Sequence, residues 1–168
     1  MFSAKDIAIW FLLKNNAMVK EHVVANDDEY EVYEGITHLK LQKLLYYAQG
    51  LSLAINKEPL FAENIEAWKH GPVIPEVYSV YCSNGRNIIE IEMGNNEEKI
   101  LTNIENDDKV NNILNLTYNN FAIYTAWQLR EMTHENNGPW DITQKTKGIN
   151  GIIDLETMKD YFEREVVE

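Results

Sequence analysis

The chain of 168 residues contains a single cysteine and only four histidines, so it is poor in the residues that build disulfide scaffolds and metal centres. One cysteine, Cys82, excludes an intramolecular disulfide framework. Zinc ligands usually occur in close pairs, such as two histidines four residues apart on a helix, and His22, His38, His70 and His134 lack such a partner. The sequence therefore predicts no metal site and no cofactor.

Motifs that bind phosphate or carry a nucleophile are also missing. The eight glycines are scattered, and neither G-x-x-x-x-G-K, G-x-G-x-x-G nor G-x-S-x-G occurs. Cys82 would act as a nucleophile only if a histidine and an acid approached it in space. At the apolar end of a short predicted helix, it is more simply a small hydrophobic residue, so we predict no catalytic residue.

Basic residues are scarce, because 15 Lys and Arg stand against 27 Asp and Glu and give a net charge of −12. Such a surface repels nucleic acid and anionic membranes, so we expect neither as a partner. No apolar stretch approaches the roughly 18 residues that suggest a membrane span. The apolar run 7–13 lacks a basic flank and a cleavage site, so it is not a signal peptide. We expect a cytoplasmic protein with a neutral or basic partner.

Hydrophobic residues, which form 45% of the chain, follow helical spacing through most of its length. We predict a mainly α fold, with residues 1–168 as a single compact helical domain and a small β-hairpin within 86–104. The segment 20–34 is weakly patterned and is expected to be a surface loop or a short helical or hairpin excursion. The predicted helices cover about 4–15, 38–56, 75–82, 108–117, 126–133, 139–140 and 155–162, with N-caps at Ser3, Thr37, Asp107 or Asp108, Thr125 and Asp154.

The predicted helix 38–56 has two apolar stripes on nearly opposite sides. Leu41, Leu44 and Ala48 belong to the first, whereas Tyr46 and Leu53 belong to the second. Two stripes indicate either a central helix surrounded by other helices or a helix whose second stripe faces a partner protein.

A sharply turned junction follows at 66–75, where the sequence reads EAWKHGPVIP. Gly71 and Pro72 end the extended segment expected at 65–68, and Pro75 is suited to the first position of a helix. Trp68 and His70 are thus held on a rigid turn. These side chains either close the core or present a surface. For Trp68, the sequence pattern favours packing in the core.

The combination of these segments resembles the Panacea domain, the SocA-like family of type II antitoxins that also includes phage-associated proteins. The strings on helix 38–56 and at the junction are long and specific. The matching segments are 39–50 (LKLQKLLYYAQG), 57–61 (KEPLF), 65–78 (IEAWKHGPVIPEVY), 125–129 (TAWQL), 133–134 (TH), 139–140 (PW), Gly148 and 158–162 (MKDYF).

The resemblance implies a helical domain that neutralises a cognate protein toxin by direct binding, with delivery of the toxin to a ClpXP-type protease as a further route. No basic arm remains that would bind an operator. The alternatives are a hydrolase or transferase using Glu66, His70 and His134, and a phage accessory protein without a cognate toxin. We expect the second stripe of helix 38–56 to be exposed and to contact the toxin together with the junction. The expected partner-binding residues are Lys43, Tyr46, Tyr47, Trp68, His70, Pro72, Val73, Tyr78 and His134.

Overall fold

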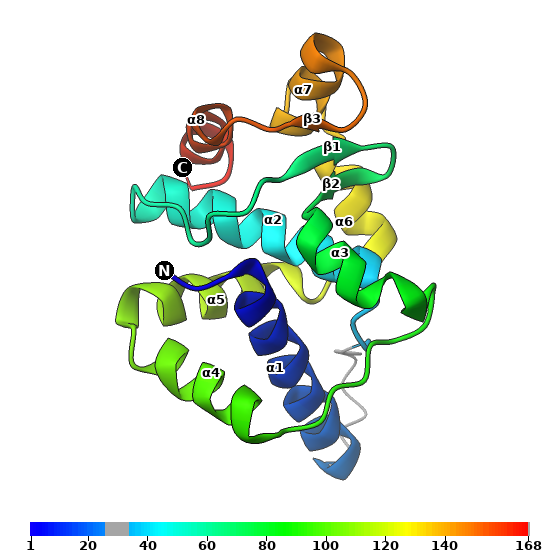
Figure 1. Ribbon diagram of the computed structural model, residues 1–168, viewed down its shortest axis with the longest axis vertical. Coiled ribbons are helices and arrows are strands. Elements are labelled where there is room, and N and C mark those ends of the chain that lie inside the picture. Colours follow the sequence, from blue (N-terminus) through cyan, green and yellow to red (C-terminus); the bar gives the residue numbers. More distant parts are fainter. Residues whose placement is uncertain (26–33, 168) are drawn as a thin grey trace.

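The structure is a computed structural model that describes residues 1–25 and 34–167 (Figure 1). These residues form eight α-helices and three short strands, which confirms the mainly α prediction. The strands make one antiparallel sheet in the order β2-β1-β3. The helices are α1 Ala4–Ala25, α2 His38–Ile55, α3 Pro75–Tyr81, α4 Asn95–Glu105, α5 Asp108–Phe121, α6 Ala126–Thr133, α7 Pro139–Lys147 and α8 Leu155–Glu165, and the strands are β1 Glu66–Trp68, β2 Gly71–Val73 and β3 Gly151–Ile152.

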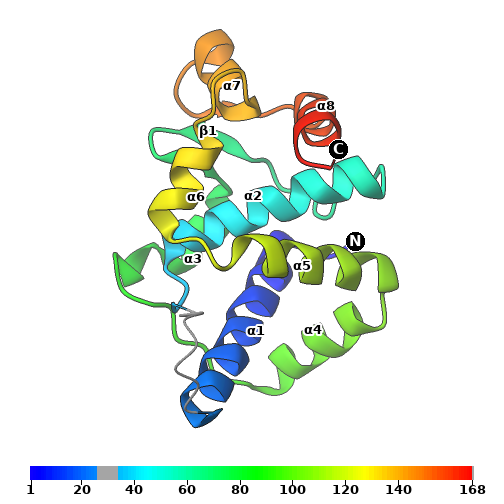
Figure 2. The ribbon, with the colours of Figure 1, turned by 180° about the vertical axis from the view of Figure 1, so that it is seen from behind.

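Helix α2 lies at the centre of the fold. Helices α1, α3, α5, α6 and α8 and strand β2 all pack against it, and every residue from Lys40 to Ala54 is buried. Figures 1 and 2 show α2 crossing the middle of the molecule, with α8 on one side of it and α1 and α5 on the other. A helix that is apolar on opposite sides can be stable only when both sides are covered. Of the two interpretations of its stripes, the central helix is the correct one.

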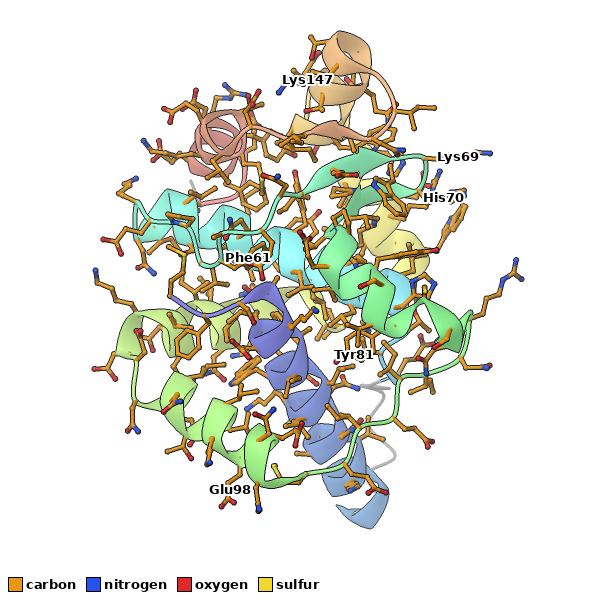
Figure 3. All side chains as sticks on the ribbon, viewed as in Figure 1. Phe61, Lys69, His70, Tyr81, Glu98 and Lys147 are labelled. Atoms are coloured by element: carbon orange, nitrogen blue, oxygen red, sulfur yellow. The ribbon has the colours of Figure 1, made fainter. Side chains whose placement is uncertain are left out.

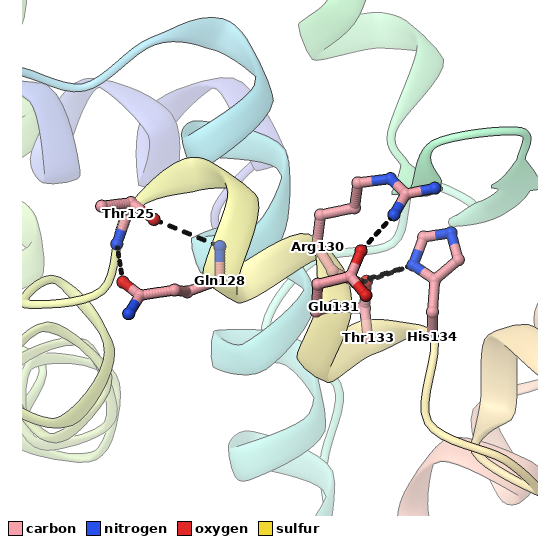
Figure 4. A network of polar contacts seen from close by, with 6 residues as sticks. All are labelled: Thr125, Gln128, Arg130, Glu131, Thr133 and His134. Carbon is pink, nitrogen blue, oxygen red and sulfur yellow. Dashed lines mark hydrogen bonds and ion pairs between the residues drawn. The ribbon is translucent and has the colours of Figure 1, made fainter.

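Four of the predicted N-caps, Ser3, Thr37, Asp107 and Thr125, form side-chain bonds at the starts of α1, α2, α5 and α6, whereas Asp154 precedes α8 without one. The Thr37 side chain accepts a hydrogen bond from the Lys40 N–H at 3.3 Å, and Asp107 accepts one from Val110 N–H at 3.2 Å. Thr125 forms a capping box with Gln128, in which each side chain bonds the backbone N–H of the other residue (Figure 4). These contacts satisfy N–H groups that have no partner within the helix.

The predicted end of the first helix near residue 15 is wrong, because α1 continues to Ala25. Asparagine can end a helix, because its side chain is able to bond the nearby backbone. Instead, Asn15 Nδ2 donates to the Glu34 carbonyl at 3.2 Å, and Asn15 Oδ1 accepts from the Tyr118 hydroxyl at 2.9 Å. Residues 20–25 of the segment 20–34 are thus helical, and residues 26–33 lie outside the described residues.

The predicted hairpin within 86–104 is also wrong, because α4 occupies 95–105. Ile100 and Ile104 share one helical face, which packs toward the core. Ile89 does lie beside another segment, since its N–H donates to the Ile36 carbonyl at 2.9 Å. The hairpin instead joins β1 to β2 at the Gly-Pro junction, in the register Ala67 to Pro72.

Among the described residues, no helix combines the length and the apolar character that a membrane crossing needs.

Candidate partner-binding surface

The second stripe of α2 is covered rather than exposed. Lys43 has no exposed surface, and Tyr46 and Tyr47 keep only 2% and 5% of theirs. The Tyr47 ring stacks on Phe121 at 4.0 Å between centroids, and both tyrosines pack edge-on against Phe162. Helices α5 and α8 therefore occupy the face on which we expected the toxin, and that expectation of exposure is wrong.

The polar side chains of α2 serve the fold by holding neighbouring backbone segments. Gln42 bonds both backbone groups of Ile74, accepting from N–H at 2.7 Å and donating to C=O at 3.4 Å. Lys40 Nζ donates to the Ala122 carbonyl at 2.7 Å. Lys43 Nζ donates to the Pro72 carbonyl at 2.8 Å and so ties α2 to the hairpin.

Burial of Lys43 changes its chemistry. Burial and the nearby Arg130 guanidinium lower the pKa of Lys43 from its ordinary 10.5 to about 7. Gly71 leaves the space that the ammonium occupies, since a Cβ there would lie 2.8 Å from Lys43 Nζ. Its φ of +103° is also a conformation that favours glycine. Lys43 thus fixes the Gly-Pro junction from within.

Substituting Lys43 by methionine is expected to remove part of the pH dependence of stability. Between the folded pKa near 7 and the unfolded value of 10.5, the unfolded chain binds the additional proton, so the stability of the wild type rises with pH. From about pH 7.5 to about pH 9 this gain amounts to about 2 kcal/mol, and Lys43→Met lacks it. Urea unfolding of both proteins at the two pH values measures the difference. Equal changes in both would contradict a buried lysine that loses its proton.

The hairpin and α3 present a cluster of aromatic side chains at the surface. Trp68 and Tyr78 are half-buried, with ring centroids 4.9 Å apart, and His38 lies 5.6 Å from Tyr78. The Trp68 Nε1–H donates to Glu66 Oε2 at 2.7 Å, which fixes the indole. His70 is exposed at the outer end of the hairpin, as Figure 3 shows.

Helix α6, whose last residue Thr133 lies beside Gly71 of the hairpin, carries another exposed ring on its first turn. It packs against β2, and Trp127 on its first turn is 63% exposed. The Arg130 guanidinium lies 4.7 Å from the centre of the Trp127 ring and is paired with Glu131 (Figure 4). We call Trp68, His70, Tyr78 and Trp127 the hairpin surface.

The nine expected partner-binding residues therefore separate by exposure. Pro72 and Val73 are buried in β2. The three expected residues on α2, which are Lys43, Tyr46 and Tyr47, are buried as well. The exposed or half-buried ones are Trp68, His70, Tyr78 and His134. Trp127 was missed, although its place outside the apolar face of α6 was a signal that could have identified it.

Glu66, His70 and His134, on which the enzyme alternative depends, are not joined to one another by hydrogen bonds in the described part of the chain. Glu66 accepts from Trp68. The His134 Nδ1–H donates to the Arg130 carbonyl at 2.6 Å, and its ring lies 3.8 Å from that of Trp140. Burial lowers the pKa of His134.

Within the described ranges, no group of three or more His, Cys, Asp or Glu side chains is placed to hold a metal ion.

Comparison with known proteins identifies the family. The model of the family described as "Antitoxin SocA-like, Panacea domain" matches residues 41–141, which include most of α2, the hairpin and α6. Antitoxin SocA of Caulobacter vibrioides (strain NA1000 / CB15N) is 33% identical over 122 residues, which are 68% of this chain and 63% of that relative. This chain thus spans less than two thirds of the relative's length. No solved structure matches the chain. Because the family match covers more than half of the sequence, the chain belongs to the antitoxin SocA-like, Panacea domain family.

Proposed function

We propose that this chain is an antitoxin that neutralises a protein toxin by direct binding. Membership of the antitoxin SocA-like family is the observation that carries this proposal. Lys40, Gln42 and Lys43 on α2 hold neighbouring backbone segments, so we look for the contact with a partner on other elements.

The hairpin surface is the part of the molecule that best suits contact with the toxin. Large aromatic rings with a polar edge are enriched where proteins bind one another, because each buries much area at low conformational cost. Trp127 and His70 are exposed, and Trp68 and Tyr78 expose part of their rings. Lys43 and Gln42 hold the hairpin and the start of α3 from within, so the rings stand on a rigid support.

Co-expression tests the proposed function. The reading frame beside the gene for this chain would be expressed alone and together with the chain, and cell growth would be followed. Growth arrest that the chain relieves, with co-purification of the two proteins, supports an antitoxin that acts by contact. A neighbouring product that does not impair growth would favour the phage accessory alternative.

Replacing Trp127 by alanine is expected to weaken toxin binding about thirtyfold, which corresponds to about 2 kcal/mol for an aromatic side chain at the centre of an interface. Because Trp127 is 63% exposed, the free energy of unfolding should change by less than about 0.5 kcal/mol. Titration calorimetry measures the affinity, and urea unfolding measures the stability.

Met93→Ala is the matched control for Trp127→Ala. Met93 is 58% exposed and precedes α4, which packs against α1 and α5, so its removal should leave affinity unchanged. Equal affinities for a folded Trp127→Ala variant and the wild type would show that α6 does not contribute to the interface.

Delivery to a ClpXP-type protease is a separate step that the binding experiment does not address. The lifetime of the toxin would be followed in cells with and without the protease, in the presence of the chain. Rapid loss of the toxin only when the protease is present supports delivery, whereas a long-lived but inactive toxin supports inhibition by binding alone.

A further inference from the structure

Basic side chains from α2 and α6 meet where the end of α6 touches the hairpin. A Cβ on Gly71 would lie 2.8 Å from Lys43 Nζ and 3.0 Å from Thr133 Oγ1, so both helices converge on this residue. The Arg130 carbonyl accepts from Thr133 Oγ1 at 2.8 Å and from His134 Nδ1–H at 2.6 Å. Lys43, Arg130 and His134 are therefore neighbours at the Gly-Pro junction.

These basic groups create a positive region in a chain whose net charge is −12. Burial lowers the pKa of Lys43, and the charge of the Arg130 guanidinium lowers it further. Burial also lowers the pKa of His134, and the charges of Arg130 and Lys43 act in the same direction. Among the described residues, no carboxylate opposes these shifts at Lys43 or His134. The junction therefore favours an anionic group over a further cation.

Of the three basic side chains, Arg130 is the one whose charge a partner can reach. Lys43 has no exposed surface, and His134 Nε2 is buried. The Arg130 side chain is 20% exposed, and its guanidinium lies 4.7 Å from the centre of the Trp127 ring. Its Nη1 is paired with Glu131 (Figure 4), whereas Nε and Nη2 have no hydrogen-bond partner in the described part of the chain. The guanidinium thus lies at the hairpin surface with donors unused.

The carboxylate that Arg130 contacts within the chain is weakly held. Glu131 is 57% exposed and follows Arg130 directly on α6. Side chains of consecutive helical residues point in different directions, so they face each other less well than residues three or four apart. Exposed ion pairs contribute little to stability, because water and salt screen them. Another carboxylate can therefore replace Glu131 at little cost.

We propose that Arg130 binds an acidic side chain of the toxin, and that Glu131 holds the place of this carboxylate in the free chain. This proposal rests on the proposed function. A guanidinium binds a carboxylate through two parallel N–H groups, and stacking on Trp127 fixes its plane. Arginine and tryptophan are both enriched among the residues that dominate binding energy. A single acidic side chain suits this place better than a nucleic acid, which the net charge of −12 repels.

Two substitutions with opposite expected effects test the proposal on the complex. Arg130→Met removes the guanidinium and is expected to weaken toxin binding about tenfold or more. Glu131→Gln removes the competing carboxylate and is expected to strengthen binding about two- to fivefold. Adding Glu131→Gln to Arg130→Met should give no further gain, because the two residues act through one pair. Titration calorimetry measures the affinities of the wild type and the three variants.

Glu76→Gln is the matched control for Glu131→Gln. Glu76 is exposed on the first turn of α3, two residues from Tyr78 of the hairpin surface, and forms no ion pair within the described ranges. Any change in affinity that it causes should be the same with and without Arg130.

Three results would overturn the proposal. They are weaker binding of Glu131→Gln, a gain from Glu131→Gln that persists in the Arg130→Met background, and wild-type affinity of Arg130→Met. Urea unfolding must show that Arg130→Met is folded. If it is not, Arg130→Lys takes its place, because lysine keeps the charge but lacks the planar fork.

A second experiment needs no toxin. Sodium acetate replaces sodium chloride at constant ionic strength in solutions of the isotopically labelled chain, and the Arg130 Nε–H signal is followed. We expect acetate to shift this signal more in Glu131→Gln than in the wild type, where Glu131 competes for the guanidinium. Equal shifts in the two proteins, or no shift in either, would contradict a carboxylate site at Arg130.

The two experiments separate this proposal from the proposed function. A chain that relieves toxicity while its Arg130→Met variant binds normally is an antitoxin that does not use this carboxylate contact. A chain that relieves no toxicity but shows the effect of acetate keeps the carboxylate site and loses the toxin as the source of its ligand.

Discussion

Replacing Phe162 by alanine is expected to lower the free energy of unfolding by about 3–5 kcal/mol, the usual cost of removing a buried aromatic ring. Phe162 has no exposed surface, and its ring packs edge-on against Tyr46 at 5.4 Å and Tyr47 at 5.8 Å between centroids. It also occupies the space over Gly50, where a Cβ would lie 2.3 Å from the ring. The loss combines the hydrophobic area of the ring with a cavity that the central helix cannot close. Urea unfolding measures it.

Val167→Ala is the control for Phe162→Ala, because Val167 follows α8 and is 46% exposed. Its substitution should change stability by less than about 0.5 kcal/mol. Helix α8 lies outside residues 41–141, which the family model matches, so the comparison also tests whether this helix belongs to the same cooperative unit. An unchanged unfolding midpoint in Phe162→Ala would mean that α8 does not stabilise α2.

The sequence predicted those parts of the fold that depend on local chemistry. The beginnings of α2, α5 and α6 follow from Thr37, Asp107 and Thr125, whose side chains satisfy N–H groups within the same turn. Pro75 likewise opens α3 at the position where its missing N–H has no effect. Such contacts lie within three or four residues, so a reader of the sequence can find both partners.

The errors arose where partners are distant in the sequence. Asn15 would end a helix in isolation, but it bonds Tyr118 and the backbone of Glu34 instead. The alternation around Ile89 and Ile91 suggested a strand, yet Ile89 bonds the backbone of Ile36 while the following segment becomes α4. Tertiary contacts thus overrode local preference in both segments.

In the candidate site too, the sequence predicted some residues correctly and failed where the contact is between residues distant in the chain. The resemblance drew attention to Trp68, His70 and Tyr78, which the structure places at or near the surface. It drew equal attention to Lys43 and Tyr47, because a charged residue and a tyrosine on a helix usually reach water. Lysine is rarely buried without a partner, and the partner here is the carbonyl of Pro72, 29 residues away in the chain. That pairing was not visible in the sequence.

Gln49 gives the second large effect that we expect, because one side chain holds three backbone groups. Gln49 is fully buried, and its Oε1 accepts from the N–H groups of Leu60 and Phe61 at 2.8 and 3.2 Å. Its Nε2 donates to the Phe61 carbonyl at 3.0 Å. Gln49→Leu keeps the side chain's size but leaves these groups unpaired, at about 1–3 kcal/mol each. We expect urea unfolding to show a loss of about 3–5 kcal/mol, which includes the gain from an apolar side chain.

Asn112→Leu is the control for Gln49→Leu, since Asn112 is exposed on α5 and its side chain has no hydrogen-bond partner among the described residues. It should change stability by less than about 0.5 kcal/mol.

Gln49→Glu separates the contribution of the hydrogen bonds from that of packing. A buried carboxyl has a raised pKa, so the folded state binds the additional proton and stability falls as pH rises through that range. When protonated, the carboxyl can accept from both N–H groups and donate to the Phe61 carbonyl, as the amide does. We therefore expect Gln49→Glu to approach the wild type at about pH 5 and to fall below it at about pH 8. An equal deficit at both pH values would show that shape, rather than these three hydrogen bonds, makes glutamine necessary at this position.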